Sequence, residues 1–135
     1  MTDLEKNKAV ATRWLLELWG EGDLTVADEI MSLDYVRHDQ SNPITGPEEY
    51  KKLIKTYRSA ISNLQVIMDF MVAEDDKVFI LWTARGTVRK EVHGIRPTCN
   101  LAITEVRVMD LLRIVDGKIV ESWPSYEVLD SKMQP

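Results

Sequence analysis

The spacing of apolar residues changes from a helical period to a strand period near the middle of the chain. Before residue 62, apolar positions recur every three or four residues, as on one face of a helix. This pattern predicts helices over residues 2–19, 24–31 and 47–62. From Leu64 onward the period moves toward two, which is typical of strands because successive side chains point to opposite faces.

The second half of the chain reads as consecutive strands joined by tight turns. Strands are expected over residues 64–72, 78–88, 102–114 and 118–126, and residues 34–39 form a short strand or an extended turn. Asp116-Gly117 between the last two strands is a strong hairpin signal. Helices followed by antiparallel strands imply one α+β domain over residues 1–135. We expect the helices to cover one face of a strongly curved sheet, which then forms a cone with an internal pocket.

Asp110 interrupts an otherwise apolar stripe on the third predicted strand. Read in twos, that face of the strand carries Val106, Val108, Asp110, Leu112 and Ile114. Burying an ionised carboxylate there is costly. Asp110 is therefore neutralised or hydrogen-bonded, or it faces a cavity in which a carboxyl with a perturbed pKa is useful. A salt bridge to an arginine, or a loop cap, is the structural alternative.

The hairpin allows the neighbours of Asp110 to be counted. A two-residue turn at Asp116-Gly117 places Trp123 opposite Asp110, whereas a bulged three-residue turn shifts the register by one and turns Trp123 away. We prefer the two-residue turn, in which Glu121 shares the face of Asp110. The predicted pocket wall then comprises Val108, Asp110, Glu121 and Trp123, with Trp82 from the preceding strand.

Other candidate site residues lie outside the sheet. His38 follows the short segment after residue 34, where a neutral imidazole could hold Asp110 or a substrate oxygen. A surface histidine paired with Asp39 is the alternative. Trp14 and Tyr57 lie on apolar helix faces, either in the core or with a polar atom in the cavity. His93 is more simply a loop residue.

Composition narrows the classes of partner. The chain has 135 residues, 44% of them hydrophobic and 29% charged, and a net charge of −5, which argues against nucleic acid or an anionic membrane as partner. No apolar run approaches a signal peptide core or a membrane span. The lone Cys99 fits a reducing cytoplasm. Metal-ligand spacings and glycine-rich phosphate loops are missing from the sequence.

Six short pieces of the chain together carry a family resemblance. They are WGEGDL (19–24), YVRHD (35–39), GPE (46–48), WTARGT (82–87), HGIRPT (93–98) and DLLRIVDGKIVESW (110–123). In their order and spacing the chain resembles the SnoaL-like polyketide cyclase family of the NTF2-like superfamily. Two positions depart from related patterns: Val88 stands where many relatives have histidine, and proline follows Trp123 where epoxide-hydrolase relatives have an acidic residue.

The resemblance implies a cone-shaped α+β barrel, often a dimer through its sheet, with no metal or organic cofactor. It also implies that Asp110 is the general acid/base of an intramolecular aldol closure and that His38 lies in the same pocket. The leading hypothesis is thus a cofactor-independent cyclase or isomerase acting on a small, hydrophobic, carbonyl-bearing, polyketide-like intermediate, with Trp82 and Trp123 holding that substrate.

Two alternatives stay open from the sequence. One is a small-molecule-binding NTF2-like protein without catalysis. The other is an epoxide-opening hydrolase in which Asp110 and Glu121 activate water. A homodimer is expected from apolar residues on the opposite sheet face, namely Phe79, Leu81, Met109 and Leu111.

Overall fold

Helices occupy the first part of the chain and a six-stranded sheet most of the rest. The computed structural model describes residues 2–98 and 102–129. Its elements are α1 (Asp3–Arg13), the π-helix η1 (Trp14–Gly20), α2 (Thr25–Ile30), β1 (Met31–Arg37), β2 (Ile44–Thr45), α3 (Gly46–Ala60), β3 (Ile61–Glu74), β4 (Lys77–Val88), β5 (Ile103–Val115) and β6 (Lys118–Val128). The predicted α+β class is confirmed.

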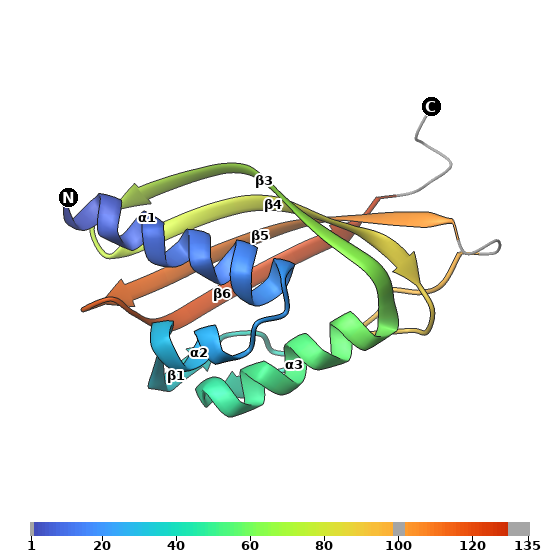
Figure 1. The fold of residues 1–135 in the computed structure, drawn as a ribbon, viewed down its shortest axis with the longest axis horizontal. Coiled ribbons are helices and arrows are strands. Elements are labelled where there is room, and N and C mark those ends of the chain that lie inside the picture. The colour runs from blue at the N-terminus through green and yellow to red at the C-terminus, as the bar shows by residue number, and fades with distance from the viewer. Residues whose placement is uncertain (1, 99–101, 130–135) are drawn as a thin grey trace.

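The sheet is curved but open. Its strand order is β2-β1-β6-β5-β4-β3, so β2 and β3 form the two edges. Neighbours pair antiparallel, except that β1 runs parallel to β6. Figure 1 shows α1 lying in front of the strands and α3 running beside the bent end of β3. The helices thus cover one face of the sheet, and the core lies between the two layers.

Local sequence signals explain where the elements begin and bend. Thr2 caps α1 in a capping box, since its hydroxyl accepts the Glu5 N–H while the Glu5 carboxylate accepts the Thr2 N–H. β3 bends where Asn63 adopts a φ of 55° and the pairing with β4 shifts. At this bend only glycine fits at position 86, because a Cβ atom there would lie 2.5 Å from Ile61 Cγ2 and 2.9 Å from the Ser62 carbonyl oxygen.

The β5–β6 hairpin has the predicted turn but a different register beyond it. Asp116 and Gly117 have φ angles of 50° and 77°, and Val115 pairs with Lys118, as a two-residue turn requires. One extra residue, Val120, then bulges from β6 between the pairs Ile114–Ile119 and Arg113–Glu121.

This bulge makes the predicted pairing of Asp110 with Trp123 wrong. Asp110 lies opposite Pro124, and Trp123 lies opposite Leu111. Every residue of β6 after the bulge therefore has its side chain on the other face from the one expected. Ser122, Pro124 and Tyr126 point toward the helices, whereas Glu121 and Trp123 point away from them.

Two further differences concern the first half of the chain. The first helix becomes a π-helix at Trp14 instead of continuing as an α-helix, and the predicted loop before α3 contains the short strand β2. Cys99 lies outside the described residues. No helix among the described residues is long and apolar enough to cross a membrane.

Candidate active site

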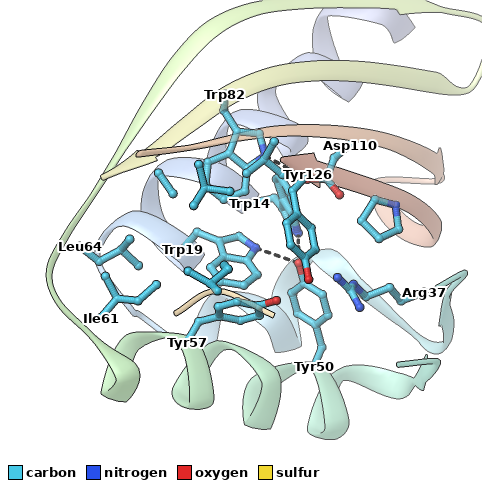
Figure 2. Close-up of a pocket in the computed structure, with 15 residues that line it drawn as sticks. Trp14, Trp19, Arg37, Tyr50, Tyr57, Ile61, Leu64, Trp82, Asp110 and Tyr126 are labelled. Carbon is cyan, nitrogen blue, oxygen red and sulfur yellow. Dashed lines mark hydrogen bonds between the residues drawn. The ribbon is translucent and has the colours of Figure 1, made fainter. Parts of the chain in front are cut away.

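A largely apolar cavity lies between the helices and the inner face of the sheet. It holds about 590 Å³ of empty space, part of which is open to solvent at its mouth. Aromatic and aliphatic side chains form most of the wall, and two charged side chains reach it (Figure 2). The lining residues are Trp14, Trp19, Arg37, Tyr50, Tyr57, Ile61, Leu64, Trp82, Ala84, Ile95, Val106, Val108, Asp110, Pro124 and Tyr126.

Asp110 is the buried carboxyl of this cavity. It is 5% exposed and lies on β5 between Ile80 of β4 and Pro124 of β6. The indole N–H of Trp82 donates a hydrogen bond of 2.9 Å to its Oδ2 atom. Burial raises the pKa of Asp110 to about 7, against the opposing effects of the Trp82 hydrogen bond and the positive charge of Arg37. The carboxyl can therefore take up and release a proton near neutral pH.

Arg37 is the cationic side chain of the cavity. It ends β1, is 7% exposed, and its Nη1 atom donates to Asp39 Oδ2 at 3.1 Å and to the Asn42 carbonyl oxygen at 3.3 Å. Tyr35, two residues earlier on the same face of β1, is also buried, and its hydroxyl lies 2.5 Å from Ser122 Oγ. The alternation of β1 thus directs Arg37 inward and the next residue outward.

His38 lies on the outer face of the sheet. Its side chain is 40% exposed, and its ring stacks on Trp123 with a centroid distance of 5.0 Å and an interplanar angle of 16°. Its Nε2 atom lies 3.3 Å from Glu121 Oε1. The structure therefore brings His38, Glu121 and Trp123 together, but on the face opposite to Asp110. Strand alternation at residue 38 and the bulge at Val120 account for this difference from the expected pocket.

Besides Asp110, four of the candidate site residues from the sequence line the cavity, namely Trp14, Tyr57, Trp82 and Val108. Their contact with a substrate stays a prediction. The sequence analysis missed Trp19, Arg37, Tyr50 and Tyr126 among others. Extending the strand alternation from Tyr35 would have predicted that Arg37 points inward. Tyr126 could not be predicted in this way, because it faces the cavity only as a result of the bulge in β6, and no residue of β6 signals that bulge.

The tyrosines of the cavity differ in their hydrogen bonding. The Tyr50 oxygen accepts the indole N–H groups of Trp14 at 2.9 Å and of Trp19 at 2.8 Å. Burial raises the pKa of Tyr50 well above its usual value. The Tyr126 hydroxyl instead donates to the backbone carbonyl of His93 at 2.7 Å.

A small turn lies beside the tyrosines. Val92 and Ile95 pair with each other through two N–H···O bonds of 2.9 Å and are both buried. The His93 ring lies 5.3 Å from that of Tyr57, centroid to centroid. His93 is a loop residue, as expected, and its segment contributes Ile95 to the cavity wall.

The cavity combines one titratable carboxyl, one cation and several phenols in apolar surroundings. Among residues 2–98 and 102–129, no three His, Cys, Asp or Glu side chains converge as metal ligands would. Such a site can move a proton to and from carbon or oxygen on an apolar molecule, while apolar walls exclude water.

Comparison with known proteins identifies the family of the chain. The family model described as SnoaL-like polyketide cyclase matches residues 9–134. No curated protein matches the chain.

Solved structures with the same fold cover most of the chain. AclR from Streptomyces galilaeus, described as a candidate hydroxylase, is 26% identical, with a TM-score of 0.77 over 93% of this chain and 81% of AclR. A candidate SnoaL-like polyketide cyclase from Jannaschia sp. CCS1 is 18% identical, with a TM-score of 0.81 over 94% and 90% of the two chains. IdmH from Streptomyces antibioticus, described as a candidate polyketide cyclase, is 23% identical, with a TM-score of 0.74 over 90% and 91%.

Proposed function

Because the chain belongs to the SnoaL-like polyketide cyclase family, we propose that it is a cofactor-independent cyclase or isomerase. Its substrate is a small, hydrophobic, carbonyl-bearing molecule of polyketide type, and Asp110 is its general acid/base. The observation that carries this proposal is a buried carboxyl with a pKa of about 7 on the wall of an apolar cavity. A pKa near the working pH is what a group needs to accept a proton and return it.

The proposed reaction is an internal aldol closure. Asp110 removes a proton from a carbon next to a carbonyl group, and the electron pair of that C–H bond forms an enolate. The enolate carbon attacks a second carbonyl of the same molecule, so that a C–C bond forms and the second oxygen becomes an alkoxide. Protonated Asp110 returns its proton to that alkoxide, and the product is an isomer of the substrate. An isomerase would instead return the proton to a different carbon.

Two features of the site support this assignment. Trp82 fixes Asp110 by a hydrogen bond and keeps one carboxylate oxygen engaged, which leaves the other for the substrate. Arg37 is buried on the same cavity wall and stabilises negative charge there. The sequence suggested that a neutral His38 holds Asp110 or a substrate oxygen. We assign the stabilisation of charge on the substrate oxygen to Arg37 instead.

The epoxide-opening alternative requires two carboxylates that converge on one water molecule. Asp110 points into the cavity, whereas Glu121 lies on the outer face in contact with His38 and Arg113. This separation favours the cyclase or isomerase over the hydrolase that the sequence left open.

Deuterium exchange tests the proton abstraction without the natural substrate. Ethyl benzoylacetate is an aromatic β-keto ester with an acidic C–H group, and its exchange in D₂O is followed by NMR. We expect the protein to accelerate this exchange saturably and Asp110→Asn to lose most of the acceleration, about 10²–10⁴-fold for a general base. Circular dichroism checks that the variant is folded.

Glu121→Gln is the matched control, because it removes a carboxylate on the same hairpin but on the outer face. It should exchange like the parent protein. Full exchange activity in Asp110→Asn would overturn the assignment, and saturable binding without any acceleration by the parent would favour the binding-only alternative.

We also propose that the protein forms a homodimer through the outer face of its sheet. Met109, Phe70 and Val72 are between 37% and 53% exposed on this face, beside Leu81 and Leu111. Sedimentation equilibrium should show a dimer that Leu81→Lys weakens, and a monomeric parent protein at all concentrations would reject this proposal.

A further inference from the structure

Tyr50 has an unusual set of hydrogen-bond partners for a buried phenol. Two N–H donors, from Trp14 and Trp19, point at its oxygen, and both bonds are buried. With two donors on the oxygen, the remaining capacity of the hydroxyl group is to donate its own proton. Among the described residues, no hydrogen bond from that hydroxyl proton to an acceptor is formed; its oxygen takes part only in the bonds from the two indoles.

Tyr50 is also placed at the cavity wall. It is 2% exposed and belongs to the lining residues. In Figure 2 its hydroxyl lies at the end of the dashed lines from the tryptophans, between these rings and Arg37. A buried donor without an acceptor destabilises the protein, because the donor has lost its hydrogen bond to water. A ligand oxygen in the cavity would remove this destabilisation, because it could accept the Tyr50 proton.

The π-helix η1 explains how two indoles reach one oxygen. Trp14 and Trp19 are five residues apart within η1. Hydrogen bonds of a π-helix join residues five apart, so side chains with this spacing lie on the same side. In an α-helix with 3.6 residues per turn they would diverge. Edge contacts of Trp19 and Tyr35 with the Tyr50 ring, at centroid distances of 6.0 and 5.3 Å, hold the phenol in this orientation.

We propose that the Tyr50 hydroxyl donates a hydrogen bond to the carbonyl oxygen of the substrate and stabilises the enolate that forms from it. This inference rests on the proposed function, since it names the group that faces the reacting oxygen. The two indole donors polarise the phenol and so strengthen its own donation. The bond gains strength as the carbonyl becomes an enolate, which is the condition for lowering a barrier.

Tyr50 acts here as a hydrogen-bond donor and not as an acid. Burial keeps the pKa of Tyr50 well above its usual value, so the phenol retains its proton throughout. The proton removed from carbon goes to Asp110, and the negative charge that appears on the substrate oxygen is held by the Tyr50 O–H and by the nearby cation Arg37.

The test uses 9-fluorenone, an aromatic ketone that has no α-hydrogen and cannot form an enolate. Its carbonyl stretching band, isolated with a ¹³C label, moves to lower frequency when a donor binds the oxygen. We expect saturable binding with such a shift in the parent protein. Tyr50→Phe should lose the shift and about 3–10-fold in affinity, the effect of one neutral hydrogen bond.

Tyr35→Phe is the matched control. It also removes a buried tyrosine hydroxyl, but one already paired with Ser122 and outside the cavity lining, so the shifted band should persist. Trp19→Phe keeps Tyr50 and removes one donor to its oxygen, so it should give a smaller shift. This second variant provides the test if Tyr50→Phe fails to fold.

Three results would overturn the proposal: an unchanged band in folded Tyr50→Phe, an unchanged band in Trp19→Phe, or no saturable binding of 9-fluorenone by the parent. Failure of the proposed function is distinguishable from these. Fluorenone offers Asp110 no proton, so the band shift in the parent protein and its loss in Tyr50→Phe should be observed even if the exchange experiment shows that Asp110 is not a base.

Discussion

The two faces of the β5–β6 hairpin give their carboxyl groups opposite environments. On the outer face Glu121 contacts His38 and Arg113, and Arg107 pairs with Glu127. On the inner face Asp110 has one neutral donor, Trp82, and apolar neighbours. The backbone is shared, so the difference comes from solvent. Water and basic side chains surround the outer carboxylates, whereas burial raises the pKa of Asp110 to about 7.

The stability of the fold does not explain why a carboxyl group stands at position 110. A buried carboxyl whose pKa is raised destabilises the folded state wherever it must ionise, and an amide or an apolar residue would avoid that cost. Outer ion pairs, in contrast, contribute about 0–1 kcal/mol each and impose no such cost. The comparison therefore supports the proposal that the chemistry takes place on the inner face, and measurements on matched positions of the two faces can contradict it.

The largest expected effect is on stability as a function of pH. Between the ordinary pKa of 3.8 and the folded pKa of about 7, the unfolded state releases a proton that folded Asp110 retains. Rising pH therefore favours unfolding in this window, and the cost is complete above pH 7. Asp110→Asn removes this cost, so its unfolding free energy should exceed that of the parent at pH 8 by about 4 kcal/mol at most. Denaturant titrations at several pH values measure it.

The advantage of Asp110→Asn should shrink as the pH falls and disappear near pH 3, below both pKa values, where the parent carboxyl is protonated in the folded and the unfolded state. Glu121→Gln serves as the outer-face control and should change stability by less than about 1 kcal/mol at either pH. A variant Asp110→Asn that is less stable than the parent at pH 8 would contradict the assignment and indicate a structural ion pair instead.

A smaller effect, on the pKa of Asp110, is expected when the hydrogen bond from Trp82 is removed. Trp82→Phe keeps an aromatic wall but deletes the N–H group that favours the ionised carboxylate. Hydrogen bonds to charged groups contribute about 1.5–3 kcal/mol, so the pKa of Asp110 should rise by about one unit or more. Titration of the carboxyl ¹³C signal measures the shift.

Trp14→Phe is the control for this titration, because its N–H group donates to Tyr50 and not to Asp110. An unchanged or lowered pKa of Asp110 in Trp82→Phe would show that the Trp82 hydrogen bond does not stabilise the ionised form.

The sequence predicts which side chains lie on the inner face wherever the period of two is unbroken. Alternation along β5 placed Asp110 among Val106, Val108 and Leu112, and β4 placed Trp82 beside it, as the structure has them. The turn at Asp116-Gly117 was also predictable, because a two-residue turn needs positive φ at both residues. These features depend on local geometry that a few neighbouring residues determine.

Features that depend on an irregularity could not be predicted in this way. Val120 looks like any strand residue, yet its bulge decides whether Trp123 or Pro124 lies beside Asp110. The π-helix likewise gives no local signal except that Trp14 and Trp19 are five residues apart. Tyr50 was overlooked for the same reason, since its partners become visible only when η1 and α3 pack together. The bulge in β6 and the π-helix η1 each shift the backbone repeat by one residue, and each shift changes which polar side chains face the cavity.

The smallest expected effect concerns Trp123, which the uninterrupted register would place in the cavity. In the structure it is 37% exposed and stacks on His38 outside the sheet. Trp123→Ala should therefore cost about 0.5–1.5 kcal/mol of stability from the lost stacking, and it should leave 9-fluorenone affinity and deuterium exchange within about twofold of the parent, since an outer-face position contributes no cavity contact. A loss of affinity as large as the roughly 3–10-fold expected for Tyr50→Phe would mean that β6 pairs with β5 without the bulge at Val120, which would place Trp123, rather than Pro124, beside Asp110.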